Sequence, residues 1–146
     1  MRQLLMLIFI CFMCSSWQMG KDERDITLKF NRKKYQIRLP KDGFSLSEYK
    51  YAEGIYKTYY YGDSSLITIY LGSNMHRPML KEPEYILTDS ARETEFIVRR
   101  GVSKNSNRYW QEMSTHEILF RFNNVRKSEL QMFENAFKEI KITSYR

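Results

Sequence analysis

Residues 117–140 read EILFRFNNVRKSELQMFENAFKEI, and this stretch decides the fold class because it holds one strand pattern and one helix pattern. In its first part, Ile118, Phe120 and Phe122 fall at every second position, which is the spacing of side chains on one face of a β-strand. In its second part, apolar residues recur every three or four positions, as on one face of an α-helix. The stretch therefore predicts a strand over 117–122 followed by a C-terminal helix.

This helix has the clearest pattern of any in the chain. Its apolar positions are Leu130, Phe133, Phe137 and Ile140, with Ala136 beside them. Ser128 and Gln131 have the spacing of a capping box, in which each side chain bonds a free backbone N–H group of the first turn. We therefore expect a helix that begins with this capping box and packs its apolar face against a sheet.

Upstream of this stretch, further segments have the alternation of half-buried strands and are separated by turn residues such as Asn31, Gly43 and Gly54. These segments are 26–30, 34–39, 44–52, 55–61, 66–71, 94–102 and 109–114. The fold class is therefore expected to be α+β, with an antiparallel β-sheet of about six to eight strands and the C-terminal helix packed on one face.

One long stretch, 73–91, interrupts the series of strands and contains Pro78 and Pro83. We expect it to be irregular apart from a short helix. Long loops in compact domains usually serve a function, so this stretch is a candidate for a binding loop.

The N-terminal segment has the pattern of an export signal. Arg2 precedes ten residues without a polar side chain, LLMLIFICFM over 4–13, whereas a membrane-spanning helix needs about 20 apolar residues. We therefore expect a signal peptide over 1–16, a polar tether over 17–24 and a single exported domain over 25–146.

The end of the signal permits two interpretations. Cys14, Ser15 and Ser16 offer the small residues that a signal peptidase recognises, with cleavage before Trp17. Alternatively, Cys14 receives a lipid, as in bacterial lipoproteins, although the preceding Met13 is bulkier than usual in such signals. We favour lipidation of Cys14, and in either case we expect a periplasmic protein or a lipoprotein anchored to the inner or outer membrane.

The balance of basic and acidic residues indicates which classes of partner the protein is expected to bind. The 24 basic and 17 acidic residues give a net charge of +7, or +6 once Arg2 is removed with the signal. A basic exported protein is suited to an acidic protein, an anionic glycan or a membrane surface, whereas export argues against nucleic acid. Short basic groups occur at 32–34, 99–100 and 126–127, where turns and strand ends are expected.

Few residues could support catalysis or bind a metal. Both cysteines, Cys11 and Cys14, lie in the signal, and the two histidines do not have the spacing of a zinc site. The chain has neither a Gly-x-Ser-x-Gly motif nor a glycine-rich phosphate loop. Two pairs of carboxylates, Glu82 with Glu84 and Glu93 with Glu95, are expected in a loop and on a solvent-facing surface. The sequence therefore predicts a protein that is not an enzyme and needs neither a metal nor another cofactor.

Tyrosine is concentrated between residues 49 and 61, where six occur. Tyrosine rings suit protein interfaces and the stacking of sugars, and they are also common in strands. Alternation places Tyr60 on the face opposite Tyr59 and Tyr61, so at least one ring should be on an outer face. The expected partner-binding residues are Tyr59, Tyr60, Tyr61, Met75, His76, Arg77 and Tyr85.

A family resemblance accompanies these patterns. Residues 37–40 (IRLP) followed by Gly43 and Phe44, then Tyr109 and Trp110 in a strand, and a closing helix, resemble the layout of PsbP-like domains. These are small α/β/α domains of exported proteins and bacterial lipoproteins. The resemblance implies a binding or assembly factor and supplies no catalytic residues.

The sequence leads to a functional hypothesis. We expect a non-enzymatic envelope protein that binds another protein, and specifically an immunity protein that neutralises an effector toxin delivered to the periplasm. The alternative is an envelope-assembly or polysaccharide-binding lipoprotein.

Overall fold

The computed structural model describes residues 24–52, 54–72, 85–93 and 95–145. These residues form mostly antiparallel β-sheet with one short C-terminal α-helix. The strands before the longest gap are β1 (Asp25–Phe30), β2 (Lys33–Arg38), β3 (Phe44–Tyr51), β4 (Gly54–Tyr61) and β5 (Leu66–Gly72). After it come β6 (Tyr85–Glu93), β7 (Phe96–Ser103), β8 (Tyr109–Ser114), β9 (Ile118–Val125), the 3₁₀ turn η1 (Lys127–Glu129), helix α2 (Leu130–Lys138) and β10 (Lys141–Ser144).

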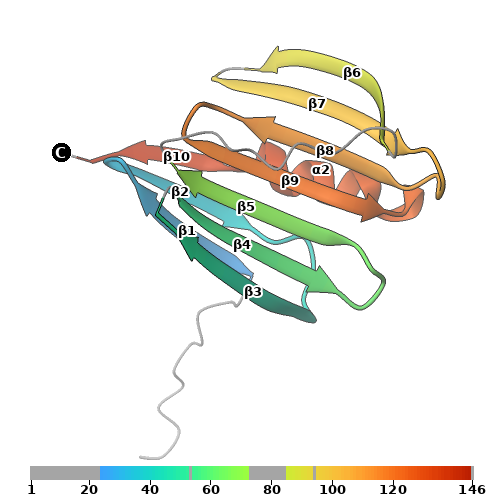
Figure 1. Cartoon of the computed structure of the whole chain (residues 1–146), viewed down its shortest axis with the longest axis horizontal. Coiled ribbons are helices and arrows are strands. Elements are labelled where there is room, and N and C mark those ends of the chain that lie inside the picture. The colour runs from blue at the N-terminus through green and yellow to red at the C-terminus, as the bar shows by residue number, and fades with distance from the viewer. Residues whose placement is uncertain (1–23, 53, 73–84, 94, 146) are drawn as a thin grey trace, which may run out of the picture.

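The strands belong to two sheets (Figure 1). The main sheet has seven strands in the order β3-β4-β5-β9-β8-β7-β6, and the small sheet has three in the order β1-β2-β10. All neighbouring strands in both sheets are antiparallel. The main sheet is built from two meanders, β3-β4-β5 and β6-β7-β8-β9, which meet where β5 pairs with β9.

Aromatic rings connect the main sheet to the small sheet and to the helix. Phe122 of β9 lies 5.6 Å from Phe133 and 5.2 Å from Phe137 of α2, measured between ring centroids. Phe120, two residues earlier on the same face of β9, lies 6.2 Å from Tyr35 of β2 and 6.3 Å from Phe137. All five rings are buried. Both β2 and α2 therefore contact the face of the main sheet that carries Phe120 and Phe122, which we call the inner face; the opposite face is the outer face.

The small sheet joins segments from the two ends of the described chain. Strands β1 and β2 are connected by Asn31 and Arg32, whose φ angles of 44° and 62° are those of a two-residue type I′ hairpin turn. Strand β10 then pairs with the other edge of β2, placing Ile142 opposite Tyr35. The inner side of this sheet contributes Leu28, Tyr35 and Ile37 to the core.

Much of this arrangement agrees with the sequence patterns. The α+β class, the antiparallel pairing and the C-terminal helix are confirmed. The single sheet that we expected is instead two sheets, and two strands were missed. Residues 85–93, expected to be part of a loop, form β6, and Lys141–Ser144 form β10. The short helix expected within 73–91 is absent from the described residues 85–91, and 73–84 lie outside the described residues.

The start of the helix also differs from the prediction. No side chain caps either η1 or α2, and Gln131 instead donates a hydrogen bond of 2.8 Å to Asn135, one turn later. The expected capping box is therefore wrong. A turn of 3₁₀ helix over Lys127–Glu129 precedes α2 and contains Ser128, whereas Gln131 lies within α2 itself.

Replacement of Phe122 by alanine tests the aromatic contact between sheet and helix. We expect Phe122→Ala to lower the free energy of unfolding by about 3–5 kcal/mol, because a fully buried ring is lost and a cavity remains. Tyr60→Ala, which removes an exposed ring from the same sheet, should change it by less than about 1 kcal/mol. Chemical denaturation measures both. Equal losses for the two variants would contradict the assignment of Phe122 to the core.

Candidate functional site

Four tyrosines occupy the outer face of the two strands at one edge of the main sheet. Strand register pairs Tyr49 of β3 with Tyr56 of β4, and alternation places Tyr51 and Tyr60 on the same face. Tyr49, Tyr51 and Tyr60 are 58%, 61% and 46% exposed, whereas Tyr56 is half-buried. We call these four residues the tyrosine surface.

The outer face of these strands carries no charged side chain among its described residues. The positions of β3 and β4 that share this face hold only Ser, Tyr, Gly and Thr: Ser45, Ser47, Tyr49, Tyr51, Gly54, Tyr56, Thr58 and Tyr60. The charged residues of the two strands lie on the inner face, where Glu48 and Lys57 form an ion pair at 2.7 Å. The edge strand β3 therefore has its charges on one face and an uncharged outer face.

The tyrosine surface packs against another ring on the same face of the sheet. Tyr70 of β5 is buried and lies 4.5 Å from Tyr56, which in turn contacts Tyr51 edge-to-face at 5.6 Å. Gly54 makes this arrangement possible, because a Cβ atom at that position would lie 2.6 Å from the Tyr70 ring. Three rings from three strands are thus packed in series, which reduces the rotational freedom of Tyr51 and Tyr56.

The structure separates the residues that were expected to bind a partner. Tyr59 and Tyr61 are only 2% and 5% exposed and belong to the core, and burial raises the pKa of Tyr59 to about 12. Of these three tyrosines, only Tyr60 remains on the surface, as alternation predicted. Tyr85 begins β6, at the opposite edge of the main sheet from β3. The sequence had grouped Tyr85 with Tyr59, Tyr60 and Tyr61, whereas the structure places β4 and β6 towards opposite edges of the main sheet.

The remaining predicted residues belong to other segments of the chain. Met75, His76 and Arg77 lie outside the described residues, as does Cys14 with the expected signal over 1–16. Of the expected tether, 17–23 also lie outside, whereas the carbonyl of Arg24 accepts a 2.8 Å hydrogen bond from the backbone N–H of Leu39.

Tyr49, Tyr51 and Tyr56 were seen in the sequence as members of the tyrosine cluster but were not assigned to the site. The missing information was the register of the β3–β4 hairpin. Because Tyr51 pairs with Gly54, the even-numbered positions of β4 share a face with the odd-numbered positions of β3. A two-residue connection between the strands, if assumed from the sequence, would have placed all four rings together.

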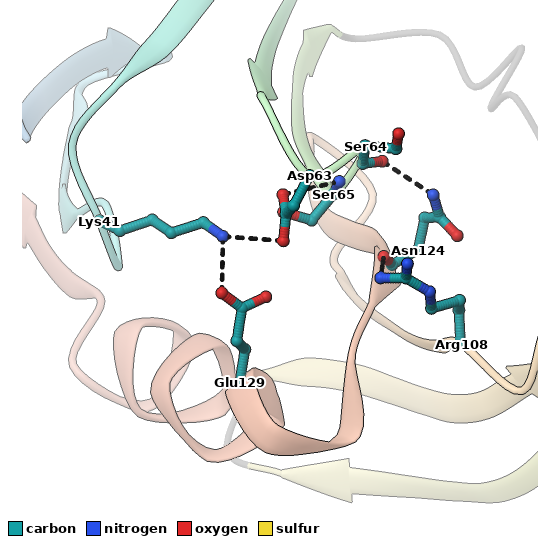
Figure 2. A network of polar contacts seen from close by, with 7 residues as sticks. All are labelled: Lys41, Asp63, Ser64, Ser65, Arg108, Asn124 and Glu129. Carbon is teal, nitrogen blue, oxygen red and sulfur yellow. Dashed lines mark hydrogen bonds and ion pairs between the residues drawn. The ribbon is translucent and has the colours of Figure 1, made fainter.

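A network of charged groups joins three loops at one end of the molecule (Figure 2). The ammonium group of Lys41 donates to Asp63 at 3.0 Å and to Glu129 at 2.9 Å. Asp63 also accepts hydrogen bonds from the backbone N–H and the hydroxyl of Ser65, at 3.1 and 2.6 Å. The network therefore connects the segment between β2 and β3, the β4–β5 turn, and η1.

Burial alone would raise the pKa of Asp63, but hydrogen bonds from Ser65 and Lys41 outweigh it and hold that pKa well below its usual range. The Lys41 ammonium also lies over the rings of Tyr61 and Phe133, at 5.1 and 5.6 Å from their centroids. Every one of these contacts is internal to the domain. We therefore assign the network a structural role, in which it holds the β4–β5 turn against the start of the helix.

A second charged pair lies on the outer face at the middle of the main sheet. Arg121 of β9 donates to Glu112 of β8 through Nε at 3.2 Å and through Nη2 at 2.5 Å, and both residues are buried. Breaking such a pair is costly, since the remaining charge would be buried without compensation. The pair therefore ties β8 to β9 across the middle of the outer face.

The described carboxylates and the histidine that were considered for catalysis each have a charged neighbour. Glu93 forms an ion pair with Arg100 at 2.6 Å and Glu95 with Lys33 at 3.3 Å, so both carboxylates contact a basic side chain. His116 is exposed, and its nearest carboxylate partner, Glu117, is its neighbour in sequence. His76, Glu82 and Glu84 lie outside the described residues. No group of three or more His, Cys, Asp or Glu residues in the described part of the chain could hold a metal ion.

Comparison with known proteins identifies no relative. No protein-family model matches the chain, and no curated protein or solved structure matches it. Within the described ranges, no helix has the length and apolar character needed to cross a membrane.

The low pKa of Asp63 predicts how stability depends on pH. Its contribution should be present above the ordinary carboxylate pKa of about 4 and should be lost as pH falls below that value, because the unfolded chain then binds a proton that the folded chain does not. Asp63→Asn should therefore lower the free energy of unfolding by about 1–3 kcal/mol at pH 7 and flatten its decline in acid.

Chemical denaturation over a range of pH tests this expectation. Asp42→Asn is the matched control, because it removes the same charge from a side chain that is 75% exposed. If Asp63→Asn retained the acid dependence of the wild type, the role given to Asp63 would be wrong.

Proposed function

We propose that this protein is an exported, non-enzymatic protein of the bacterial cell envelope that binds another protein through the tyrosine surface. The observation that carries the proposal is the absence of charge from the exposed outer face of β3 and β4, together with three exposed tyrosines. Protein interfaces are enriched in Tyr and depleted in Lys, Glu and Asp relative to the rest of the surface.

The chemistry of this face suits a protein partner. Tyrosine gives a large contact area at a low cost in conformational entropy, and serine and threonine add hydrogen-bonding groups, a combination that antibody paratopes also use. The packing of Tyr51 on Tyr56, and of Tyr56 on Tyr70, orders part of this surface before binding. Such preorganisation reduces the entropy lost on association.

The arrangement of the layers supports the same proposal. We propose that α2 packs on one face of the main sheet and so leaves the other face of β3 and β4 to the partner. The contacts of Phe133 and Phe137 with Phe122, which lies on the inner face, support this arrangement.

The specific form of the proposal is an immunity protein that neutralises a toxin delivered to the periplasm. It rests on the expected export signal and on the expected absence of a catalytic site, and the tyrosine surface supplies the contact. The alternative is a polysaccharide-binding or envelope-assembly lipoprotein, in which the same rings would stack on sugars.

Capture of a partner tests the proposal. The full-length chain, tagged at its C-terminus, would be isolated from its native envelope and from mixtures with competing strains. We expect one stoichiometric protein that remains bound at high salt, because a buried aromatic interface is less sensitive to screening than exposed charges are. Tyr49→Ala, Tyr51→Ala and Tyr60→Ala should each weaken binding about tenfold or more.

The matched control is Tyr145→Ala, since Tyr145 is a similarly exposed tyrosine that follows β10 in the small sheet. It should bind as the wild type does. Loss of binding in the control alone would overturn the assignment of the tyrosine surface. Retention of a glycan with no protein would favour the alternative, and a captured partner with toxic activity would support the immunity function.

A further inference from the structure

The outer side of the small sheet is strongly basic. Lys29 of β1, Lys34 and Arg38 of β2 and Lys141 of β10 lie at positions facing away from the core. Residues with the opposite orientation, such as Tyr35 and Ile37, are buried, which fixes the direction of the basic ones. We call these four residues the basic surface.

Little acidic charge offsets this surface. Asp25 is the one acidic residue at a strand position on this side, and its carboxylate lies 3.9 Å from Arg38. Lys29, Lys34 and Lys141 have no carboxylate within 4.0 Å among the described residues. Other cations of the chain differ: Lys33, Lys41, Lys57 and Arg100 are all held in ion pairs.

Two of these lysines repel each other. Lys29 and Lys34 are direct cross-strand partners in the β1–β2 hairpin. Like charges at such positions destabilise a sheet, because their Cβ atoms are only about 5 Å apart. An anionic surface bound at this face would relieve that repulsion.

The basic surface and the tyrosine surface point in opposite directions. The small sheet contacts the inner face of the main sheet through Tyr35 and Phe120, so its basic side lies on the far side of that layer. The tyrosine surface lies on the outer face of the main sheet. Binding at the basic surface would therefore leave the tyrosine surface accessible.

The path of the chain favours a membrane as the anionic surface. Strand β1 belongs to the small sheet and is the first strand after the N-terminal segment, which has the apolar run expected to engage the membrane during export. If Cys14 carries a lipid, as we favour, the ten residues that follow reach at most about 35 Å to β1. The basic surface would then remain close to the lipid headgroups.

We propose that the basic surface docks this protein onto the anionic lipid headgroups of a membrane. The contact is electrostatic and lies flat against the bilayer, and it orients the tyrosine surface away from it. This proposal concerns a different surface from the protein-binding one, so either can fail without the other.

Binding to lipid vesicles tests the proposal. The full-length chain would be mixed with vesicles of phosphatidylcholine alone or with equal amounts of phosphatidylcholine and phosphatidylglycerol, and the bound fraction measured by co-sedimentation. Phosphatidylcholine alone gives the contribution of the apolar N-terminal segment. We expect phosphatidylglycerol to increase the affinity, and high salt to remove this increase.

Three variants show which residues produce the increase. The triple variant K29Q/K34Q/K141Q should lose roughly 100-fold in affinity for the anionic vesicles, because each basic residue at such a surface contributes a factor of about five. The variant K104Q/R126Q/K127Q removes the same charge from the β7–β8 turn and the segment at η1, and should retain the increase. The variant K29R/K34R/K141R keeps the charge and should bind as the wild type does.

Each outcome is decisive. If only K29Q/K34Q/K141Q loses the increase in affinity that phosphatidylglycerol gives, the proposal is supported, provided that its circular dichroism spectrum matches that of the wild type. Equal losses in the first two variants would overturn it, because net charge rather than the basic surface would then explain binding. No increase with phosphatidylglycerol, or retention of the increase in the first variant, would also overturn it. None of these results depends on the protein partner.

Discussion

The contact between Phe122 in the middle of the main sheet and the two rings of α2, Phe133 and Phe137, determines how the rest of the domain is arranged. It fixes which side of β9 is buried against the helix, and strand pairing carries that choice to every other strand of the sheet. Phe120 extends the same constraint to Tyr35 and so positions the small sheet. Once the inner face is set, the register of β3 and β4 places Tyr49, Tyr51, Tyr56 and Tyr60 on the outer one.

Sequence patterns predicted the strands that supply the core, and also β3, but they missed β6 and β10. The alternation of Tyr35 and Ile37, or of Ile118, Phe120 and Phe122, is a local signal that survives in the fold. Strand β6 is an edge strand whose Ile86 and Leu87 are both exposed, and β10 has only four residues. Strand β6 pairs with β7, the next strand along the chain, and β10 pairs with β2, which is distant in sequence. Both form because the partner strand offers backbone hydrogen bonds, which the side-chain pattern of the segment itself does not show. The exposure of Tyr60 was likewise predictable from alternation. That Tyr49 and Tyr51 lie on the same face as Tyr60 was not, because it depends on the register of the β3–β4 hairpin, which alternation alone does not set.

Charge is distributed unevenly between the two outer sides of the molecule. On β3 and β4 of the main sheet, Glu48 and Lys57 form an ion pair on the inner side, and the outer side carries no charge. On the small sheet, the outer side is basic and nearly without acidic residues. The net charge of the chain therefore does not describe the charge of either surface. The physical unit is the strand face, because alternation sends neighbouring residues to surfaces with different surroundings.

The position of β10 has a consequence for when the domain can mature. This strand completes the small sheet by pairing Lys141 with Gln36, more than a hundred residues earlier, and the helix before it supplies rings to the core. Contacts over such a separation form slowly, since a long loop must close first. During synthesis on the ribosome, the edge of β2 opposite β1 stays unpaired by β10 until that last strand has emerged. The three-stranded sheet is therefore complete only when the chain has been synthesised to its last strand.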